Sequence, residues 1–247
     1  MAARQILDRL NWDLTPKSWL SRKRAAQSRD KFGGKAVILC NGPSLNRVDL
    51  SSLDGVFCIG LNKINLLFDR GAFRPNSIVA VNPFVIEQNR DFYNATDIPL
   101  FISHVGVKEV QDRPNVTFLH SVHLGHAFSK DVSISVNQGA TVTFVALQVA
   151  FHLGFRHVAL VGADHTFQQT ASPNTTIVAE GPDPNHFDPN YFAHGVQWQT
   201  ADLAESEIGY RIAAEAYALN GGEVVNATEG GQLEIFRRQS LADFLKS

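Results

Sequence analysis

From residue 35 onward, short apolar or β-branched runs alternate with helical candidates, and this alternation constrains the fold more than any other feature. The strand candidates are residues 36–40, 56–59, 77–81, 99–102, 116–119, 158–161 and 223–225. The helical candidates are residues 63–69, 85–93, 140–152 and 203–219. Alternation of this kind favours a largely parallel sheet with helices on both faces, so the chain predicts a Rossmann-like α/β fold.

The composition fits one globular domain preceded by a basic arm. The chain has 247 residues, of which 44% are hydrophobic, and this is enough for a sizeable core. We expect residues 1–34 to form the arm and residues 35–247 to form a single α/β domain. The sequence has no apolar run long enough to span a membrane and no signal-peptide core, which predicts a cytoplasmic protein. Cys40 and Cys58 fall in predicted buried strands and are expected to be free thiols.

The arm is the most basic part of the chain. Residues 1–35 carry nine Lys or Arg against three Asp, a balance of +6 in a chain whose net charge is −2. Its apolar residues are expected to form one face beside the basic Arg22, Lys23 and Arg24, and they are Ile6, Leu7, Leu10, Trp12, Trp19 and Leu20. One hypothesis is that residues 1–33 contact the anionic inner face of the membrane. The alternative is a helical arm packed on the domain or on another subunit of a homo-oligomer.

The first predicted strand runs directly into Asn41-Gly42-Pro43-Ser44. Gly42 and Pro43 indicate a sharp turn, and Ser44 is expected to cap the backbone N–H groups of a following helix. Open α/β sheets bind nucleotides at this edge, near helix N-termini. An ordinary strand-to-helix connection remains an alternative, because Asn, Gly, Pro and Ser are common in loops.

Polar residues follow other predicted strands at equivalent positions. Asn62 lies just beyond the second strand, Asn82 follows the third, and Asp164 and His165 follow the strand that ends at Gly162. The carboxyl ends of parallel strands face the same side, so we expect these residues and Asn41 to share one cleft. Asn amides both donate and accept hydrogen bonds, which suits a nucleobase edge or ribose hydroxyls. The long segment 168–200 is predicted to be a lid or binding loop.

The same motifs resemble two families. CNGPSL, VFCIGLN and SIVAVNPFVIEQN resemble the N-terminal half of the bacterial CMP-sialic-acid sialyltransferases, and LGFRHVALVGADHTF and YFAHG resemble their later motifs. From residue 139 onward, GATVTF, GADHTF, HFDPNYF and NATEGGQLEIF resemble the bacterial MptE-like domain family of polysaccharide and flagellin-glycosylation loci. That family is named after archaeal 6-hydroxymethyl-7,8-dihydropterin diphosphokinases.

The sialyltransferase resemblance implies an inverting glycosyltransferase that needs no metal and uses a nucleotide-activated, CMP-linked sugar. His194 would be the general base and Tyr191 would stabilise the departing phosphate. The implied nucleotide site consists of Asn41, Gly42, Pro43, Ser44, Asn62, Asn82, Gly162 and Asp164, with the phosphate near Ser44. The implied acceptor and lid residues are His165, His186, Asp188, Gln197 and Trp198. Residues 137–141 lack the family's Arg, which leaves the donor sugar open.

Two alternative functions remain. The MptE-like resemblance also implies an ATP-using pterin diphosphokinase, in which Asp164, Asp183 or Asp188 would hold Mg²⁺ against the phosphates. The chain has no Walker-type phosphate loop, which ranks this alternative second. A non-catalytic subunit that binds a nucleotide sugar is the third reading. Nucleic-acid binding is disfavoured, because the body of the chain is acidic and has no basic stripe.

Overall fold

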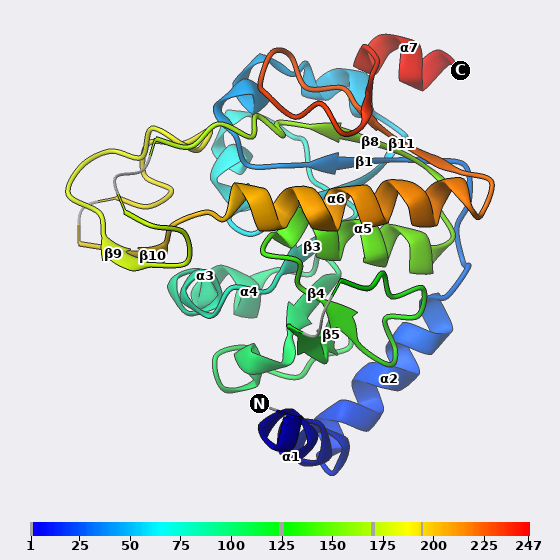
Figure 1. Cartoon of the computed structure of the whole chain (residues 1–247), viewed down its shortest axis with the longest axis vertical. Coiled ribbons are helices and arrows are strands. Elements are labelled where there is room, and N and C mark those ends of the chain that lie inside the picture. The colour runs from blue at the N-terminus through cyan, green and yellow to red at the C-terminus, as the bar shows by residue number, and fades with distance from the viewer. Residues whose placement is uncertain (1, 124–125, 169–170, 194) are drawn as a thin grey trace.

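The structure is a computed structural model that describes residues 2–123, 126–168, 171–193 and 195–247. Its centre is an eight-stranded sheet in the order β12-β11-β8-β1-β2-β3-β4-β5, and every neighbouring pair is parallel (Figure 1). The strands are β1 (Lys35–Leu39), β2 (Phe57–Leu61), β3 (Ser77–Ala80), β4 (Leu100–Ser103), β5 (Val116–Leu119), β8 (His157–Val161), β11 (Glu223–Asn226) and β12 (Arg237–Arg238). The predicted α/β fold class is confirmed, and each predicted strand lies within two residues of an observed one.

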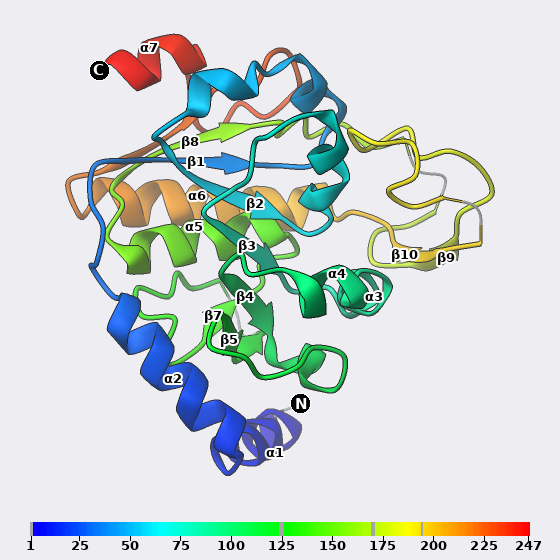
Figure 2. The ribbon, with the colours of Figure 1, turned by 180° about the vertical axis from the view of Figure 1, so that it is seen from behind.

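Helices cover both faces of the sheet. The two long helices α5 (Val142–Leu153) and α6 (Leu203–Ala218) lie on one face (Figure 1). The other face carries short elements (Figure 2), which are α3 (Pro83–Gln88), α4 (Arg90–Ala95), α7 (Leu241–Lys246) and the 3₁₀ turns η1 (Pro43–Arg47), η2 (Leu50–Leu53), η3 (Ile64–Arg70) and η4 (His104–Lys108). The single helix predicted over residues 85–93 is wrong. It divides at Asn89, which leaves helical geometry and donates its side-chain amide to Asn65 Oδ1.

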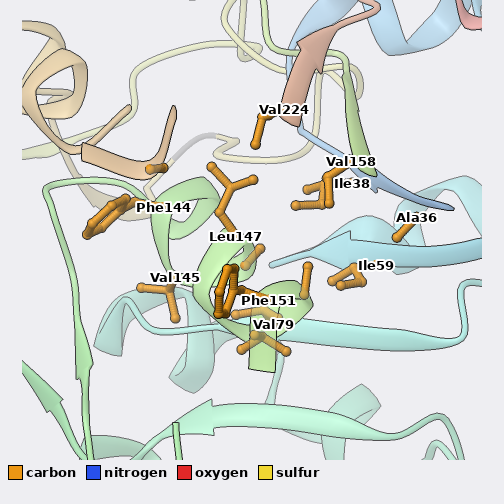
Figure 3. Packing of buried hydrophobic residues seen from close by; sticks show 14 of the residues in the cluster. Ala36, Ile38, Ile59, Val79, Phe144, Val145, Leu147, Phe151, Val158 and Val224 are labelled. Carbon is orange, nitrogen blue, oxygen red and sulfur yellow. The ribbon is translucent and has the colours of Figure 1, made fainter. Parts of the chain in front are cut away.

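Helix α5 is the centre of the core. Eleven of its twelve residues are buried, because it lies between the sheet and α6. Leu147 projects from α5 toward side chains of the strands (Figure 3), and Phe144 and Phe151 both pack against the Phe128 ring. The helix begins at its N-cap Thr141 and ends at Gly154, whose φ of 106° favours glycine. The N-terminus of this buried helix therefore points at one fixed place on the carboxyl edge of the sheet.

The strand order reverses between β1 and β8. The chain steps outward from β1 to β5 and then returns to place β8 and β11 on the other side of β1. Loops that leave β1 and β8 run in opposite directions, and they leave a crevice at the carboxyl ends of these strands. Two small ladders lie outside the main sheet: β6 (Ser121–Val122) with β7 (Val136–Asn137), and β9 (Thr176–Val178) with β10 (Gln197–Gln199).

The arm forms two helices, α1 (Ala2–Asp13) and α2 (Pro16–Ser28), and α2 packs along β5 (Figure 2). Ala25 joins the main core, and Arg24 donates to the Val116 carbonyl. The prediction that Trp12 shares one apolar face with Ile6, Leu7, Leu10, Trp19 and Leu20 is wrong. Its side chain is 5% exposed and packs 5.5 Å from the His104 ring, because it projects from the side of α1 that faces the body. In the described part of the chain, no helix combines the length and apolarity that membrane crossing requires.

Both cysteines are buried and free, as predicted. Cys40 follows β1, and Cys58 lies within β2. Burial raises the pKa of each thiol to about 12. The two thiols are therefore protonated and belong to the packing of the core.

A buried histidine connects α2 to α5 and makes the stability depend on pH. His152 accepts the Val132 N–H at Nδ1 and pairs with the Ala25 carbonyl at Nε2, 2.8 Å away. Burial lowers the pKa of His152 below its ordinary value of 6.5, so the folded state favours the neutral ring. Its contribution is complete above pH 6.5 and is lost as the pH falls through the folded-state pKa.

We therefore expect the free energy of unfolding to decrease below pH 6.5, by at most about 1.4 kcal/mol per pH unit for this group. The variant His152→Gln keeps one donor and one acceptor but does not titrate, so its decrease should be smaller. Urea unfolding of both proteins at several pH values between 5 and 8 measures the difference. Identical pH slopes would show that His152 contributes nothing to this dependence.

Candidate functional site

A cavity of about 250 Å³ opens at the carboxyl edge of the sheet, next to the switch between β1 and β8. The sequence-predicted residues that line it are Asn41, Gly42, Asn62, Asn82, Gly162, Asp164, His165, His186, Tyr191 and Trp198. The predicted residues that do not line it are Pro43, Ser44, Asp183, Asp188 and Gln197. His194 lies outside the described residues. The strand-end polar residues therefore meet in one cavity, while their roles in binding stay predictions.

The turn after β1 is built around a close contact with the loop after β8. The Gly42 N–H donates to the Gly162 carbonyl at 2.9 Å, and a Cβ at position 42 would overlap the Asp164 carboxylate. Asp164 accepts from the Ser44 hydroxyl at 2.6 Å and from the Ser44 N–H at 3.2 Å. The prediction that Ser44 caps the next helix is wrong, because Gly42 is the N-cap and Asp164 takes the Ser44 donors. A carboxylate thus lies at the place expected for a phosphate.

The three strand-end asparagines differ in what their side chains do. Asn82 Oδ1 caps α3 by accepting from the N–H groups of Phe84 and Val85, and Asn82 Nδ2 donates to Gln199 Oε1 at 3.1 Å. Asn82 therefore fixes the wall of the cavity. By contrast, Asn41 Oδ1 and Asn62 Oδ1 are buried and have no hydrogen-bond partner among the described residues. A ligand with N–H or O–H donors would satisfy these two oxygens.

The backbone around the cavity is strained. Asn62, Ala140 and His165 all line the cavity, and their φ angles of 49°, 55° and 55° lie in the left-handed region. This conformation costs roughly 1–3 kcal/mol for a non-glycine residue, and it is least expected for alanine, which has no polar group to stabilise it. Strain of this kind persists where the surrounding structure holds it, and it is concentrated at functional sites.

His186 is held in a fixed orientation at the cavity wall. Its Nδ1 lies 2.7 Å from Asp183 Oδ2, and Asp183 also accepts the N–H groups of Asn185 and Phe192. The neighbouring Phe187 N–H donates to the Asn41 carbonyl, which ties this segment to the end of β1. Because a carboxylate only accepts, Nδ1 carries the ring proton and Nε2 has a free lone pair. Nε2 makes no hydrogen bond to any residue that the structure describes, so it is available as a proton acceptor.

The Tyr191 ring packs against the His186 ring. The two rings stack with centroids 4.0 Å apart, and the tyrosine side chain is completely buried. Burial raises the pKa of Tyr191, and its hydroxyl has no hydrogen-bond partner among the described residues, although the Asn62 amide lies near it. Lys63 donates to the Tyr191 carbonyl, and burial lowers the pKa of Lys63 to about 8. The Tyr191 side chain has 0% exposure and lines the cavity, and its predicted contact with a departing phosphate stays a prediction.

Three further residues were predicted to belong to the lid, and one of them, Trp198, lines the cavity. Trp198 points inward from β10 and stacks on Phe192 with centroids 5.5 Å apart. Its neighbour Gln197 points outward, because successive strand residues face opposite sides. Asp188 pairs with Arg70 at 3.2 Å, away from the cavity. Of these predicted lid residues, only Trp198 is placed to touch a ligand.

The start of α5 supplies cavity residues that the sequence predictions missed. Gln138, Thr141 and Thr143 all line the cavity. Thr141 Oγ1 caps the helix by accepting the Thr143 N–H at 3.3 Å. The signal was present in the sequence, since a threonine directly before an apolar helical pattern is a common N-cap. Thr141 was not recognised as an N-cap because the helix was predicted to begin at residue 140, one position before it.

The carboxylates that a Mg²⁺ site would need are not gathered at the cavity. Both oxygens of Asp164 accept from Ser44, and Asp188 lies outside the lining. In the described ranges, one group of three metal-ligating side chains lies close together, and none of the three lines the cavity: Asp8, His104 and His120. His104 Nδ1 accepts the Ser121 N–H, so its Nε2 carries a proton that points to Asp8. A protonated nitrogen cannot ligate a metal, so this group holds α1 on the body instead.

Comparison with known proteins supports the fold. No protein-family model matches the sequence, and no curated protein matches it significantly. Among solved structures, the chain is similar to the MAf glycosyltransferase from Magnetospirillum magneticum AMB-1, with a TM-score of 0.52 and 17% identity. The match covers 90% of this chain and 38% of the MAf chain. At this identity, the likeness shows a shared α/β fold, and the resemblance to the MptE-like family stays a prediction.

Proposed function

We propose that this chain is a glycosyltransferase that moves a sugar from a nucleotide-activated donor, held in the strand-end cavity, to a hydroxyl of a glycan acceptor. The observation that carries the proposal is His186, which Asp183 orients at the wall of a cavity at the switch point of a parallel sheet. A fold shared with a bacterial glycosyltransferase supports the same reaction class. The glycan would belong to bacterial surface polysaccharide or glycoprotein synthesis.

The nucleotide would lie against the ends of β1 and β2. The buried oxygens of Asn41 and Asn62 would accept hydrogen bonds from an exocyclic amine of the base or from ribose hydroxyls. The sialyltransferase-like motifs favour a CMP-linked sugar. Asp164 already occupies the Ser44 donors, so the phosphate would lie elsewhere in the cavity, with the start of α5 as the nearest long helix N-terminus.

In the proposed reaction, His186 Nε2 removes the proton from the acceptor hydroxyl. The acceptor oxygen then forms a bond to the anomeric carbon as the bond from that carbon to the phosphate oxygen breaks, which inverts the configuration. The nucleotide leaves with the bonding electron pair, and the proton stays on the imidazole. His194, the base that the sialyltransferase resemblance implies, is the competing candidate for this step.

Nucleotide release from a panel of CMP-, UDP- and GDP-sugars, each with and without a mixed glycan acceptor, tests the proposal. We expect one nucleotide class to be released faster when an acceptor is present, and the same free nucleotide to raise the melting temperature. A melting shift with ATP and Mg²⁺, together with no release from any nucleotide sugar, would favour the diphosphokinase alternative. Binding without release would favour the non-catalytic subunit.

A further inference from the structure

Helix α1 packs on the body through Trp12, Asp8 and Arg9 and leaves its other large apolar side chains exposed to solvent. Asp8 pairs with His120 Nε2 at 3.2 Å and with His104, and Arg9 donates to the Ile134 carbonyl at 2.6 Å. The opposite side of the helix carries Ile6, Leu7 and Leu10, which are 60%, 60% and 51% exposed, and Leu14, directly after the helix, is 76% exposed. Surface helices of globular proteins ordinarily face the other way, with the apolar stripe on the core.

Helix α2 extends this apolar surface. Trp19 and Leu20 are 62% and 46% exposed, and the Trp19 indole N–H donates to the Asp13 carbonyl at 2.8 Å, which closes the ring against the end of α1. Lys23 lies one turn after Trp19 and is also exposed. We call this surface the arm face, and it consists of Ile6, Leu7, Leu10, Leu14, Trp19 and Leu20.

The arm carries a net positive charge, with Lys23 exposed one turn after Trp19, whereas Arg9, Lys17 and Arg24 contact the body. Residues 2–28 contain six Lys or Arg and two Asp, a balance of +4 in a chain whose total is −2. Asp13, at the end of α1, pairs with both Arg9 and Arg22, so it offers no uncompensated negative charge. An exposed apolar surface that includes a tryptophan and has basic surroundings is typical of helices that lie in a lipid interface.

We propose that the arm face binds an anionic lipid surface, with α1 lying along the interface and its apolar side chains inserted among the lipids. Anionic lipid complements the +4 balance of the arm. A second copy of the chain fits less well, because a two-fold contact would bring together two arms that each carry a net positive charge. The cavity takes no part in this contact, so the proposal stands or fails independently of sugar transfer.

Trp19 provides a direct probe of the contact. Trp12 and Trp198 are 5% and 9% exposed, so a shift of fluorescence on adding lipid reports on Trp19. The full chain is titrated with vesicles of phosphatidylcholine and phosphatidylglycerol in a two-to-one mixture, and with vesicles of phosphatidylcholine alone. We expect a blue shift and co-sedimentation with the anionic vesicles, both weakened by high salt, and we expect the shift to be lost in Trp19→Phe.

A matched pair of double variants tests the residues. Leu10→Ser with Leu14→Ser should lower the vesicle partition coefficient by about ten-fold or more, because two inserted side chains are lost. The control, Ile208→Ser with Leu219→Ser on α6, removes apolar side chains that are 39% and 76% exposed and should change nothing. Equal losses in the two variants, or no binding by the intact chain, would overturn the proposal. A dimer that the Leu10 and Leu14 changes dissociate, without lipid binding, would assign the arm face to a second copy.

Discussion

Replacement of His186 by alanine is expected to lower the rate of sugar transfer by about 10²- to 10⁴-fold, the range that general-base catalysis typically contributes. The reason is that Asp183 and Tyr191 hold this imidazole in one orientation, with Nε2 free of hydrogen bonds to the described residues. Nucleotide binding should be retained, because the donor contacts proposed for Asn41 and Asn62 come from the ends of β1 and β2, whereas His186 lies between β9 and β10. Steady-state transfer rates and nucleotide melting shifts, measured on the same preparation, separate the two effects.

Three further variants make the result specific. Asp183→Asn should also slow transfer, since the amide removes the negative charge beside Nδ1 and no longer dictates which nitrogen carries the proton. His157→Ala removes an exposed histidine at the amino end of β8 and should leave the rate unchanged. His194→Ala distinguishes the two candidate bases. If transfer is lost in His194→Ala and retained in His186→Ala, His186 is not the base.

Replacement of Gln148 by alanine is expected to lower the free energy of unfolding by about 3 kcal/mol or more. Gln148 is completely buried in α5, and its Oε1 accepts the N–H groups of Ser129 and Asn137 at 3.1 and 3.0 Å. Its Nε2 donates to the Asn137 carbonyl at 2.7 Å. Alanine would leave three backbone groups without these partners in the protein interior, and each costs about 1–3 kcal/mol.

Gln138→Ala is the matched comparison for this prediction. Gln138 follows Asn137 and makes one side-chain hydrogen bond, to Ser121 Oγ at 3.0 Å, so its loss should cost about 1 kcal/mol. Urea unfolding of the two variants and the parent protein gives both values. Similar costs at the two positions would mean that the loop over residues 129–137 gains its hydrogen bonds elsewhere when Gln148 is removed.

The strands were predictable because each is buried on both faces of the sheet and is therefore a continuous apolar run. Residues 116–119 were placed without error for this reason. The strand β12 was not predicted, since Arg237 and Arg238 lie exposed at the sheet edge and carry no apolar pattern. The polar residues after the strands were also predictable, because a parallel sheet brings its carboxyl ends to one side.

Side-chain partners across long sequence separations were beyond prediction. The Ser44 donors are taken by Asp164, which lies 120 positions later, and nothing in the turn sequence indicates this. Trp12 is buried because His104 lies beside it in the fold. The pair of Asp183 and His186 is local, but its importance depends on the path that brings Phe187 to the end of β1. Sequence patterns predicted the sheet edge at which the candidate residues gather. The hydrogen-bond partners of these residues became apparent only in the fold.

The separation of the β9–β10 ladder from the central sheet has a consequence for the shape of the cavity. In the described part of the chain, β9 and β10 pair with each other and share no ladder with the eight parallel strands. Trp198 of β10 belongs to the buried core, whereas Gln199 is exposed and lines the cavity, so changes at exposed positions of the ladder would reshape one wall of the cavity with little effect on the core. We therefore expect changes at these exposed positions to alter the shape of the cavity without altering the central sheet.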